Sequence, residues 1–171
     1  MLAKPGKKAV PLAVGLVCAL LIALLTAGRL TLAQAGTGSP PALHFDAYEP
    51  QKAVYHVTSG GGGFGREHTH LLTVLRNHMN AVGPGFLDVR VVMQGDGVDL
   101  MIAARKDAKL AEAIDRLIAD GATFVVCYNT LVQRRIDPAR DMHRVSREEI
   151  VGAGVAEVTQ LVAKGYVYLR I

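Results

Sequence analysis

The sequence has no tryptophan, only two cysteines and few aromatic residues, which make up 5% of its 171 positions. Cys18 lies in an N-terminal apolar run, so Cys127 is the single cysteine of the part expected to fold. One cysteine cannot form an intramolecular disulfide, and the sequence has neither the paired C-x-x-C spacing of zinc domains nor the C-x-x-C-H haem motif. A disulfide-stabilised scaffold, a paired-cysteine zinc domain and a c-type cytochrome are therefore excluded.

Acidic residues are absent from the first 35 positions, which hold four basic ones: Lys4, Lys7, Lys8 and Arg29. The whole chain has 19 basic and 15 acidic residues and a formal net charge of +4. Without the four N-terminal residues, the 15 remaining basic residues balance the 15 acidic ones. A general nucleic-acid binder needs a basic surface, so nucleic acid is not expected as a partner.

Residues 1–35 have the layout of a secretory signal peptide. The lysines precede an apolar or small run over residues 9–28, and Ala33-Gln34-Ala35 offers small residues where a signal peptidase cuts. Cleavage after Ala35 predicts a periplasmic or otherwise exported protein. Because the apolar run is longer than a usual signal core, an uncleaved signal anchor in the inner membrane is the alternative. In both cases the protein meets the membrane only through this N-terminal segment.

Residues 36–52 are rich in Gly, Pro and Ser and are expected to be a linker, followed by one domain over residues 53–171. In that domain short β-rich runs alternate with segments of helical periodicity. Strands are expected at 53–58, 89–93, 123–127 and 166–171, with a weaker candidate at 149–151. Helices are expected at 67–82, 107–119, 129–135 and 155–164, with a short helical piece at 98–104. This order predicts a three-layer α/β/α domain with a mostly parallel sheet of four or five strands.

Cys127 ends the apolar run 123–127 and is followed by Tyr128-Asn129-Thr130, residue types that favour the start of a helix. Ligands of parallel α/β domains bind at the carboxyl ends of the strands, which makes this edge the candidate site. A helix N-terminus lowers the pKa of a nearby thiol. Five arginines further along the chain are expected to favour the thiolate and to attract a small anion: Arg134, Arg135, Arg140, Arg144 and Arg147. The alternative is that Cys127 is an unreactive core residue.

His68 and His70 are further candidate site residues. His68 shares the apolar face of the predicted helix with Leu71 and Leu75, and we expect it to lie over Cys127 as a base or a hydrogen-bond partner. The alternative is a copper or zinc site formed by His68, His70 and Cys127. Residues two apart on a helix point to nearly opposite sides, so that metal site requires an extended segment there.

A glycine run over residues 60–65 follows the first predicted strand. A strand, a glycine loop and a helix are the elements that cradle phosphate, but Arg66-Glu67 stands where a P-loop has Lys-Ser/Thr. No acidic residue ends the second predicted strand, where dinucleotide-binding domains have one. No cofactor is therefore predicted, and the glycine loop is expected to border the thiol pocket.

Three segments resemble the DsrE/DsrF-like family: FVVCYNTL at 124–131, VVMQGDGVDL at 91–100, and GVAEV at 154–158 followed by GYVYL at 165–169. The resemblance covers residues 53–171. It implies a parallel α/β domain assembled as a homo-oligomer, a trimer or a hexamer. It also implies a cysteine that carries a persulfide between partner proteins, and only Cys127 matches that position.

The predicted function is that of an exported, sulfur-handling protein in which Cys127 takes up sulfane sulfur in a pocket formed with the glycine loop, His68 and Asn129. If it is an enzyme, it is sulfurtransferase-like. Its expected partners are a sulfur-donor or sulfur-acceptor protein or a small anionic sulfur compound. The alternatives are a non-enzymatic metal- or ligand-binding module that uses its histidines, and a structural oligomer subunit in which Cys127 is buried.

Overall fold

The computed structural model describes residues 47–60 and 66–171. The predicted leader, most of the predicted linker and most of the glycine run lie outside these residues. The strands are β1 (Gln51–Val57), β2 (Leu87–Met93), β3 (Thr123–Cys127), β4 (Ile150–Val151) and β5 (Val167–Arg170). The α-helices are α2 (Arg66–Val82), α3 (Asp99–Ala104), α4 (Ala108–Ala119), α5 (Tyr128–Arg134), α6 (Pro138–Asp141) and α7 (Gly154–Ala163). Two 3-10 turns, η1 (Gly95–Val98) and η2 (Arg147–Glu149), complete the described elements.

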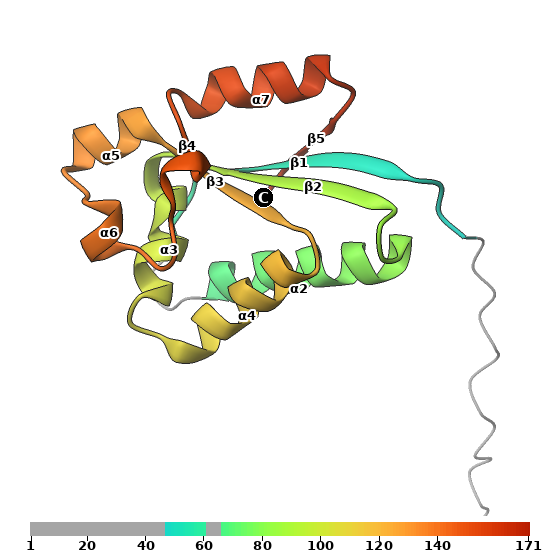
Figure 1. Cartoon of the computed structure of the whole chain (residues 1–171), viewed down its shortest axis with the longest axis horizontal. Helices are drawn as coiled ribbons and strands as arrows, with labels where there is room; N and C mark the ends of the chain where they lie inside the picture. The colour runs from blue at the N-terminus through green and yellow to red at the C-terminus, as the bar shows by residue number, and fades with distance from the viewer. Residues whose placement is uncertain (1–46, 61–65) are drawn as a thin grey trace, which may run out of the picture. The chain divides into compact units, whose positions relative to one another are not determined.

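The five strands form one parallel sheet in the order β4-β3-β2-β1-β5, as Figure 1 shows. The predicted parallel sheet is therefore confirmed. The weak strand candidate at 149–151 becomes the two-residue strand β4, in which Val151 pairs with Cys127. At the other edge of the sheet, β5 lies beside β1. All five carboxyl ends consequently lie at the same end of the sheet, on the left in Figure 1.

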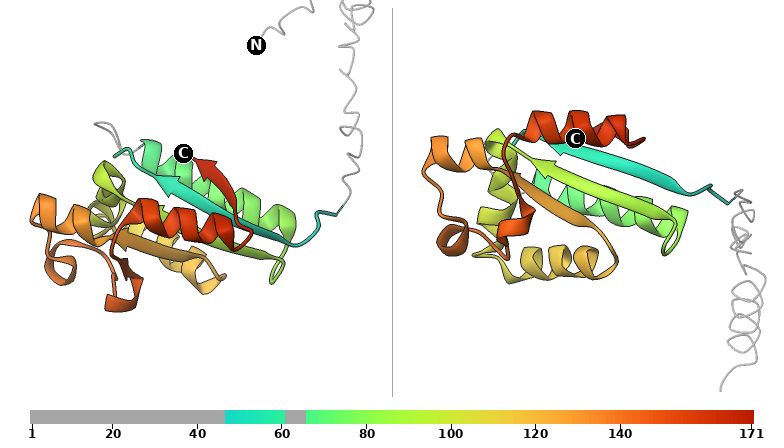
Figure 2. Two further views of the ribbon diagram at one scale, coloured as in Figure 1. Left: turned by 90° about the horizontal axis from the view of Figure 1, so that it is seen from above. Right: turned by 45° about the horizontal axis from the view of Figure 1, so that its top comes forward.

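Helices cover both faces of the sheet, which confirms the three-layer prediction. Helices α2 and α4 lie on one face and α7 lies on the other, as Figures 1 and 2 show. Alternate residues of a strand point to opposite faces. In β3, Phe124 and Val126 pack with the α2 and α4 side, whereas Val125 packs with α7. Cys127 follows Val125 by two residues and therefore lies on the α7 face.

The larger hydrophobic core lies between the sheet and helices α2, α3 and α4. Its fully buried side chains include Leu71, Leu75, Leu100, Ile114 and Phe124. A smaller cluster under α7 contains Val54, Val92, Val125, Val158, Leu161 and Tyr166. Burying side chains of this size stabilises the fold by roughly 1.5–3 kcal/mol each, before the entropy cost of ordering them.

The helix boundaries differ from the predicted ones by a residue or so, for local reasons. Asp107, expected as the first residue of a helix, is instead its N-cap, and its carboxylate accepts the N–H groups of Lys109 and Leu110. Helix α5 ends at Arg134 because Arg135 adopts a left-handed conformation with φ 54°. Strand β1 begins at Gln51, inside the predicted linker, since its polar first residues still pair with β2.

Across residues 47–60 and 66–171, none of the helices combines the length and apolar character needed to cross a membrane.

Candidate functional site

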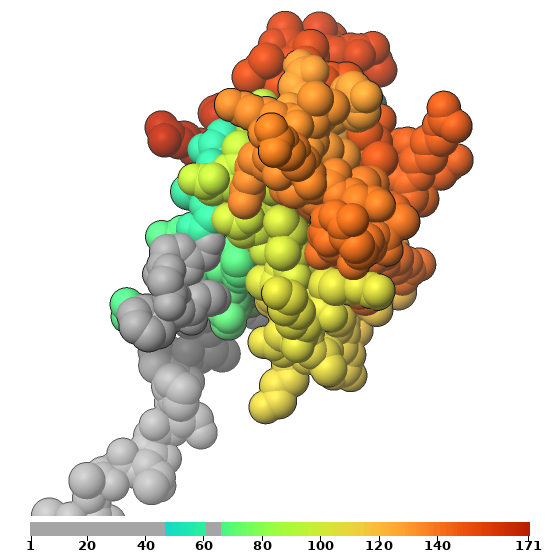
Figure 3. All heavy atoms as spheres, turned by 90° about the vertical axis from the view of Figure 1, so that its left-hand side faces the viewer, coloured from blue at the N-terminus to red at the C-terminus, as the bar shows by residue number. Residues whose placement is uncertain are grey.

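The carboxyl end of the sheet carries Cys127, which ends β3 and is the N-cap residue of α5. Figure 3 views this end of the molecule, with α5 and α6 in orange between α7 in red and the α3–α4 region in yellow. The cysteine is buried, with 5% of its surface exposed. It is a free thiol.

The first residues of two helices, α5 and α7, lie close to the Cys127 sulfur. Burial raises the pKa of this thiol, but hydrogen bonding from the Gly154 N–H, the Thr130 hydroxyl and the N–H groups of Thr130 and Asn129 outweighs burial and lowers it below its ordinary value. Gly154 is the first residue of α7, whereas Asn129 and Thr130 belong to the first turn of α5. None of the α5 donors has the geometry of a regular capping bond. The sulfur nevertheless lies near the first N–H groups of two helices, which favour a negative charge.

Thr130 is a site residue that was not singled out from the sequence. It is buried, and its hydroxyl oxygen accepts the Gly95 N–H at 2.9 Å. The same hydroxyl interacts with the Cys127 sulfur, so Thr130 links the turn after β2 to the thiol. Its place in the first turn of a helix that begins after a buried strand is the signal that could have identified it.

Asn129 contributes through its backbone. Its N–H interacts with the Cys127 sulfur and also approaches the Gly152 carbonyl oxygen at 3.4 Å, and its side chain is exposed. The predicted pocket residue is therefore next to the thiol, but the structure gives it the role of a backbone donor.

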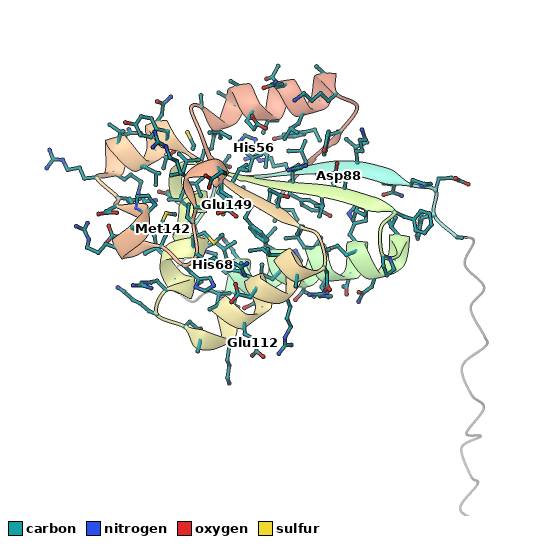
Figure 4. All side chains as sticks on the ribbon, in the orientation of Figure 1. His56, His68, Asp88, Glu112, Met142 and Glu149 are labelled. Carbon is teal, nitrogen blue, oxygen red and sulfur yellow. The ribbon has the colours of Figure 1, made fainter. Side chains whose placement is uncertain are left out.

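The expectation that His68 lies over Cys127 is wrong. His68 is in α2, which packs on the face of the sheet opposite to α7, and Figure 4 shows it below the sheet. The reason is that α2 connects β1 to β2 on one face, whereas α7 connects β4 to β5 on the other. His68 is buried and lines a cavity of about 660 Å³ together with the exposed His70, Arg66 and Arg170. Burial lowers the pKa of His68. The negative charges of Asp99 and Glu67 act in the other direction and raise it, but by less.

The alternative metal set His68, His70 and Cys127 is not assembled, since the cysteine lies on the other face. Nowhere in the described ranges 47–60 and 66–171 do three His, Cys, Asp or Glu side chains come together as a possible metal site. The exposed His70 and the buried His68 also point to different sides of α2, as their spacing on a helix requires.

His56 and Gln94 lie on the same face as Cys127, and the sequence reasoning missed them. His56 follows Val54 by two residues in β1, so it faces α7, and Figure 4 shows it between the sheet and that helix. Gln94 directly follows β2, and its side chain abuts Gly154. The β-strand alternation that places Val125 and Cys127 on one face would also have identified these two residues, given the strand order.

The arginines after Cys127 are mostly paired with carboxylates. Arg134 approaches Asp99 at 2.7 Å, and Arg140 and Arg144 pair with Asp141 and Asp115. Their charges are therefore largely neutralised. The exposed Arg147 lines a cavity of about 420 Å³ with Tyr128, Ile150 and Gly152, beside the strand that pairs with Cys127.

The model of the DsrE/DsrF-like family matches residues 52–171. Among solved structures, the chain is similar to a protein of unknown function from Methanobacterium thermoautotrophicum, with 23% identity, a TM-score of 0.57 and coverage of 71% of this chain and 99% of that one. It also matches a conserved protein of unknown function from Bacteroides thetaiotaomicron, with 14% identity, a TM-score of 0.46 and coverage of 71% and 95%. No curated protein is significantly similar. The first of these structures supports the α/β fold alone.

Proposed function

We propose, from the premise that the chain belongs to the DsrE/DsrF-like family, that Cys127 accepts and passes on sulfane sulfur as a persulfide. The observation that carries this proposal is the set of donors around the Cys127 sulfur, which lowers the pKa of the thiol although the residue is buried. The thiolate is the nucleophile in sulfur exchange, so a lowered pKa raises its fraction near neutral pH.

The transfer needs no oxidant or cofactor. The Cys127 thiolate attacks the outer sulfur of a donor persulfide R–S–SH, forming a new S–S bond while the donor S–S bond breaks. The donor leaves as the thiolate R–S⁻ and keeps the electron pair, and Cys127 becomes Cys–S–SH. An acceptor thiolate takes the outer sulfur by the same exchange. If thiosulfate is the donor, sulfite is the leaving group.

Exposed apolar side chains around Cys127 support a protein as the exchange partner. Tyr128, Val132 and Val155 are 54%, 57% and 56% exposed, and Tyr128 is the residue directly after the cysteine. Apolar side chains grouped at a surface favour contact with another protein. We therefore propose a sulfur-donor or sulfur-acceptor protein, or a further copy in a trimer or hexamer, as the partner here.

Arg147 supports a small anionic sulfur compound as a second possible donor, because its cavity lies beside β4 at the carboxyl end of the sheet.

We also propose export to the periplasm, with or without retention of the leader as a membrane anchor, on the basis of residues 1–35.

The proposal is tested by incubating the purified protein with polysulfide or thiosulfate and measuring intact mass. We expect added sulfur atoms in the wild type that are removed by a thiol reductant and are absent from Cys127→Ser. The other cysteine, Cys18, is controlled by Cys18→Ser, which should take up sulfur as the wild type does. No adduct, or an equal adduct in Cys127→Ser, refutes sulfur transfer. Labelling of the thiol in the native protein tests the alternative of a structural subunit. That alternative is supported if Cys127 reacts only after unfolding.

A further inference from the structure

His56 is a buried histidine whose hydrogen bonding is incomplete. It is 8% exposed, and its Nδ1 lies 3.1 Å from the Tyr168 hydroxyl oxygen. Its second ring nitrogen, Nε2, is buried and has no hydrogen-bond partner among the described residues. A buried polar atom without a partner is costly and rare in folded proteins, so its presence points to a role other than stability.

Gln94 connects the surroundings of His56 to those of Cys127. A Cβ atom at Gly154 would lie 2.6 Å from the Gln94 Oε1, so the amide occupies the space at the first residue of α7. The Gly154 N–H is one of the donors that favour the Cys127 thiolate. On its other side, Gln94 donates its backbone N–H to the Val57 carbonyl oxygen at 3.0 Å, next to His56 in β1.

The sheet register explains why these residues come together. Met93, the last residue of β2, pairs with Val126, so Gln94, which follows β2, lies beside Cys127 at the end of β3. His56 pairs with Val92, two residues before Gln94 on the same face. The three side chains thus lie on the α7 face of three adjacent strands, with His56 two residues behind the level of Gln94 and Cys127.

We propose that His56 and Gln94 are positioning residues for the Cys127 thiol and couple its ionisation to the protonation state of the imidazole. This inference rests on the proposed sulfur transfer, which requires the thiol to lose a proton. When Nδ1–H donates to the Tyr168 hydroxyl, Nε2 carries the lone pair and can accept a proton. The Gln94 amide, which has both donors and an acceptor, is placed on the strand between the two groups.

The other groups around His56 are compatible with a neutral imidazole. Burial lowers its pKa, an interaction with Gln94 opposes this, and the charge of Arg170 lowers the pKa further. The other titratable groups on this face of the packed elements are Lys52 on β1, Asp88 and Arg90 on β2, Tyr166 just before β5, Tyr168 in β5 and the half-buried Glu157 on α7. The Gln94 side chain interacts with the His56 ring, but no hydrogen bond of regular geometry reaches Nε2 among the described residues, so its lone pair can still take up a proton.

The coupling is tested by following the histidine ring resonances by NMR across a pH titration of the whole protein, with His56 assigned from His56→Gln. We expect the His56 resonance to show its own inflection and a second one at the pH where Cys127 ionises. The second inflection should disappear in Cys127→Ser and in Gln94→Met, which keeps the side-chain volume without the amide. His78, a half-buried histidine bound to Tyr55 and Gln51 on the opposite face, is the matched control and should show no inflection from Cys127.

A wild-type His56 resonance without the second inflection, or one that keeps it in Cys127→Ser, overturns the inference. If Gln94→Met does not fold, the comparison of wild type with Cys127→Ser is sufficient by itself. Sulfur uptake is measured separately by mass: uptake without coupling refutes this inference and leaves the proposed function, whereas coupling without uptake supports the inference and refutes sulfur transfer.

Discussion

Replacing Thr130 by valine should weaken both the fold and the acidity of the Cys127 thiol. The two side chains have nearly the same shape, so the change removes the hydroxyl without opening a cavity. That hydroxyl accepts the Gly95 N–H at 2.9 Å and interacts with the Cys127 sulfur. Thr130 is buried but Gly95 is exposed, so water can replace part of the lost interaction at the Gly95 N–H. Loss of a part-buried hydrogen bond of this kind costs about 1 kcal/mol.

Urea unfolding measures this loss. With a slope of about 1–3 kcal/mol per molar urea for a small protein, a loss of about 1 kcal/mol should lower the midpoint of Thr130→Val by about 0.3–1 M. Thr130→Ser is the matched control, because it keeps the hydroxyl and loses one methyl group, at a cost of about 0.5–1.5 kcal/mol. The two variants should therefore differ more in the pKa of the Cys127 thiol than in the free energy of unfolding.

The thiol is followed through its rate of alkylation by iodoacetamide at a series of pH values. The pKa of Cys127 is lowered in the folded protein, so the stability that it contributes is present above its ordinary pKa and is lost as the pH falls through the folded value. In Thr130→Val the pKa should rise toward the ordinary value, which slows alkylation near neutral pH and reduces the gain in stability at alkaline pH. Thr130→Ser should retain both. If Thr130→Val titrates like the wild type, the hydroxyl does not support the thiolate and the reasoning is refuted.

Three further predictions concern the core, the turn after β2 and the candidate anion site. Leu75→Ala should lower the free energy of unfolding in urea by about 2–5 kcal/mol, because Leu75 is fully buried. Val162 is half-exposed, so Val162→Ala should have little effect, and equal losses in the two variants would contradict the described core. Gly97→Ala should sharply reduce the yield of folded protein, since its Cβ would lie 2.1 Å from the last carbonyl oxygen of β1, whereas Gly152→Ala has open space and should be tolerated, as circular dichroism can check. Arg147→Glu should slow the reaction of Cys127 with thiosulfate several-fold and leave alkylation by neutral iodoacetamide unchanged, and equal effects on both reagents would argue against an anion site.

Strand alternation and helix periodicity were sufficient to predict the α/β/α layers, because each pattern depends on local residues. The run 123–127 is apolar on both faces, as a central parallel strand must be, and it became β3 without change. Positive φ values at Gly121 and Gly165 occur where the sequence predicted that α4 and α7 end.

The partners of Cys127 could not be predicted in the same way, because they depend on which face each helix covers. His68 has the apolar spacing of a residue that faces the sheet, and it does face the sheet, but from the side opposite to the thiol. Gly154 reaches Cys127 only because the chain returns from β4 across that face, and Gln94 is next to it only through the strand register. Neither contact can be predicted from the sequence unless the order of the strands in the sheet is known.

The donors around Cys127 bear on the question of whether this cysteine is reactive or structural. A neutral thiol is a weak acceptor and gains little from N–H and O–H groups directed at it, whereas a thiolate gains strongly because hydrogen bonds to a charged group are about twice as strong. A cysteine that only filled space in this core would be served as well by apolar neighbours. The approach of Gly154, Thr130 and Asn129 to one sulfur therefore favours its ionised form over its neutral form. Native thiol titration consequently separates the two interpretations: a structural cysteine should ionise at or above the ordinary thiol pKa, and a sulfur carrier should ionise below it.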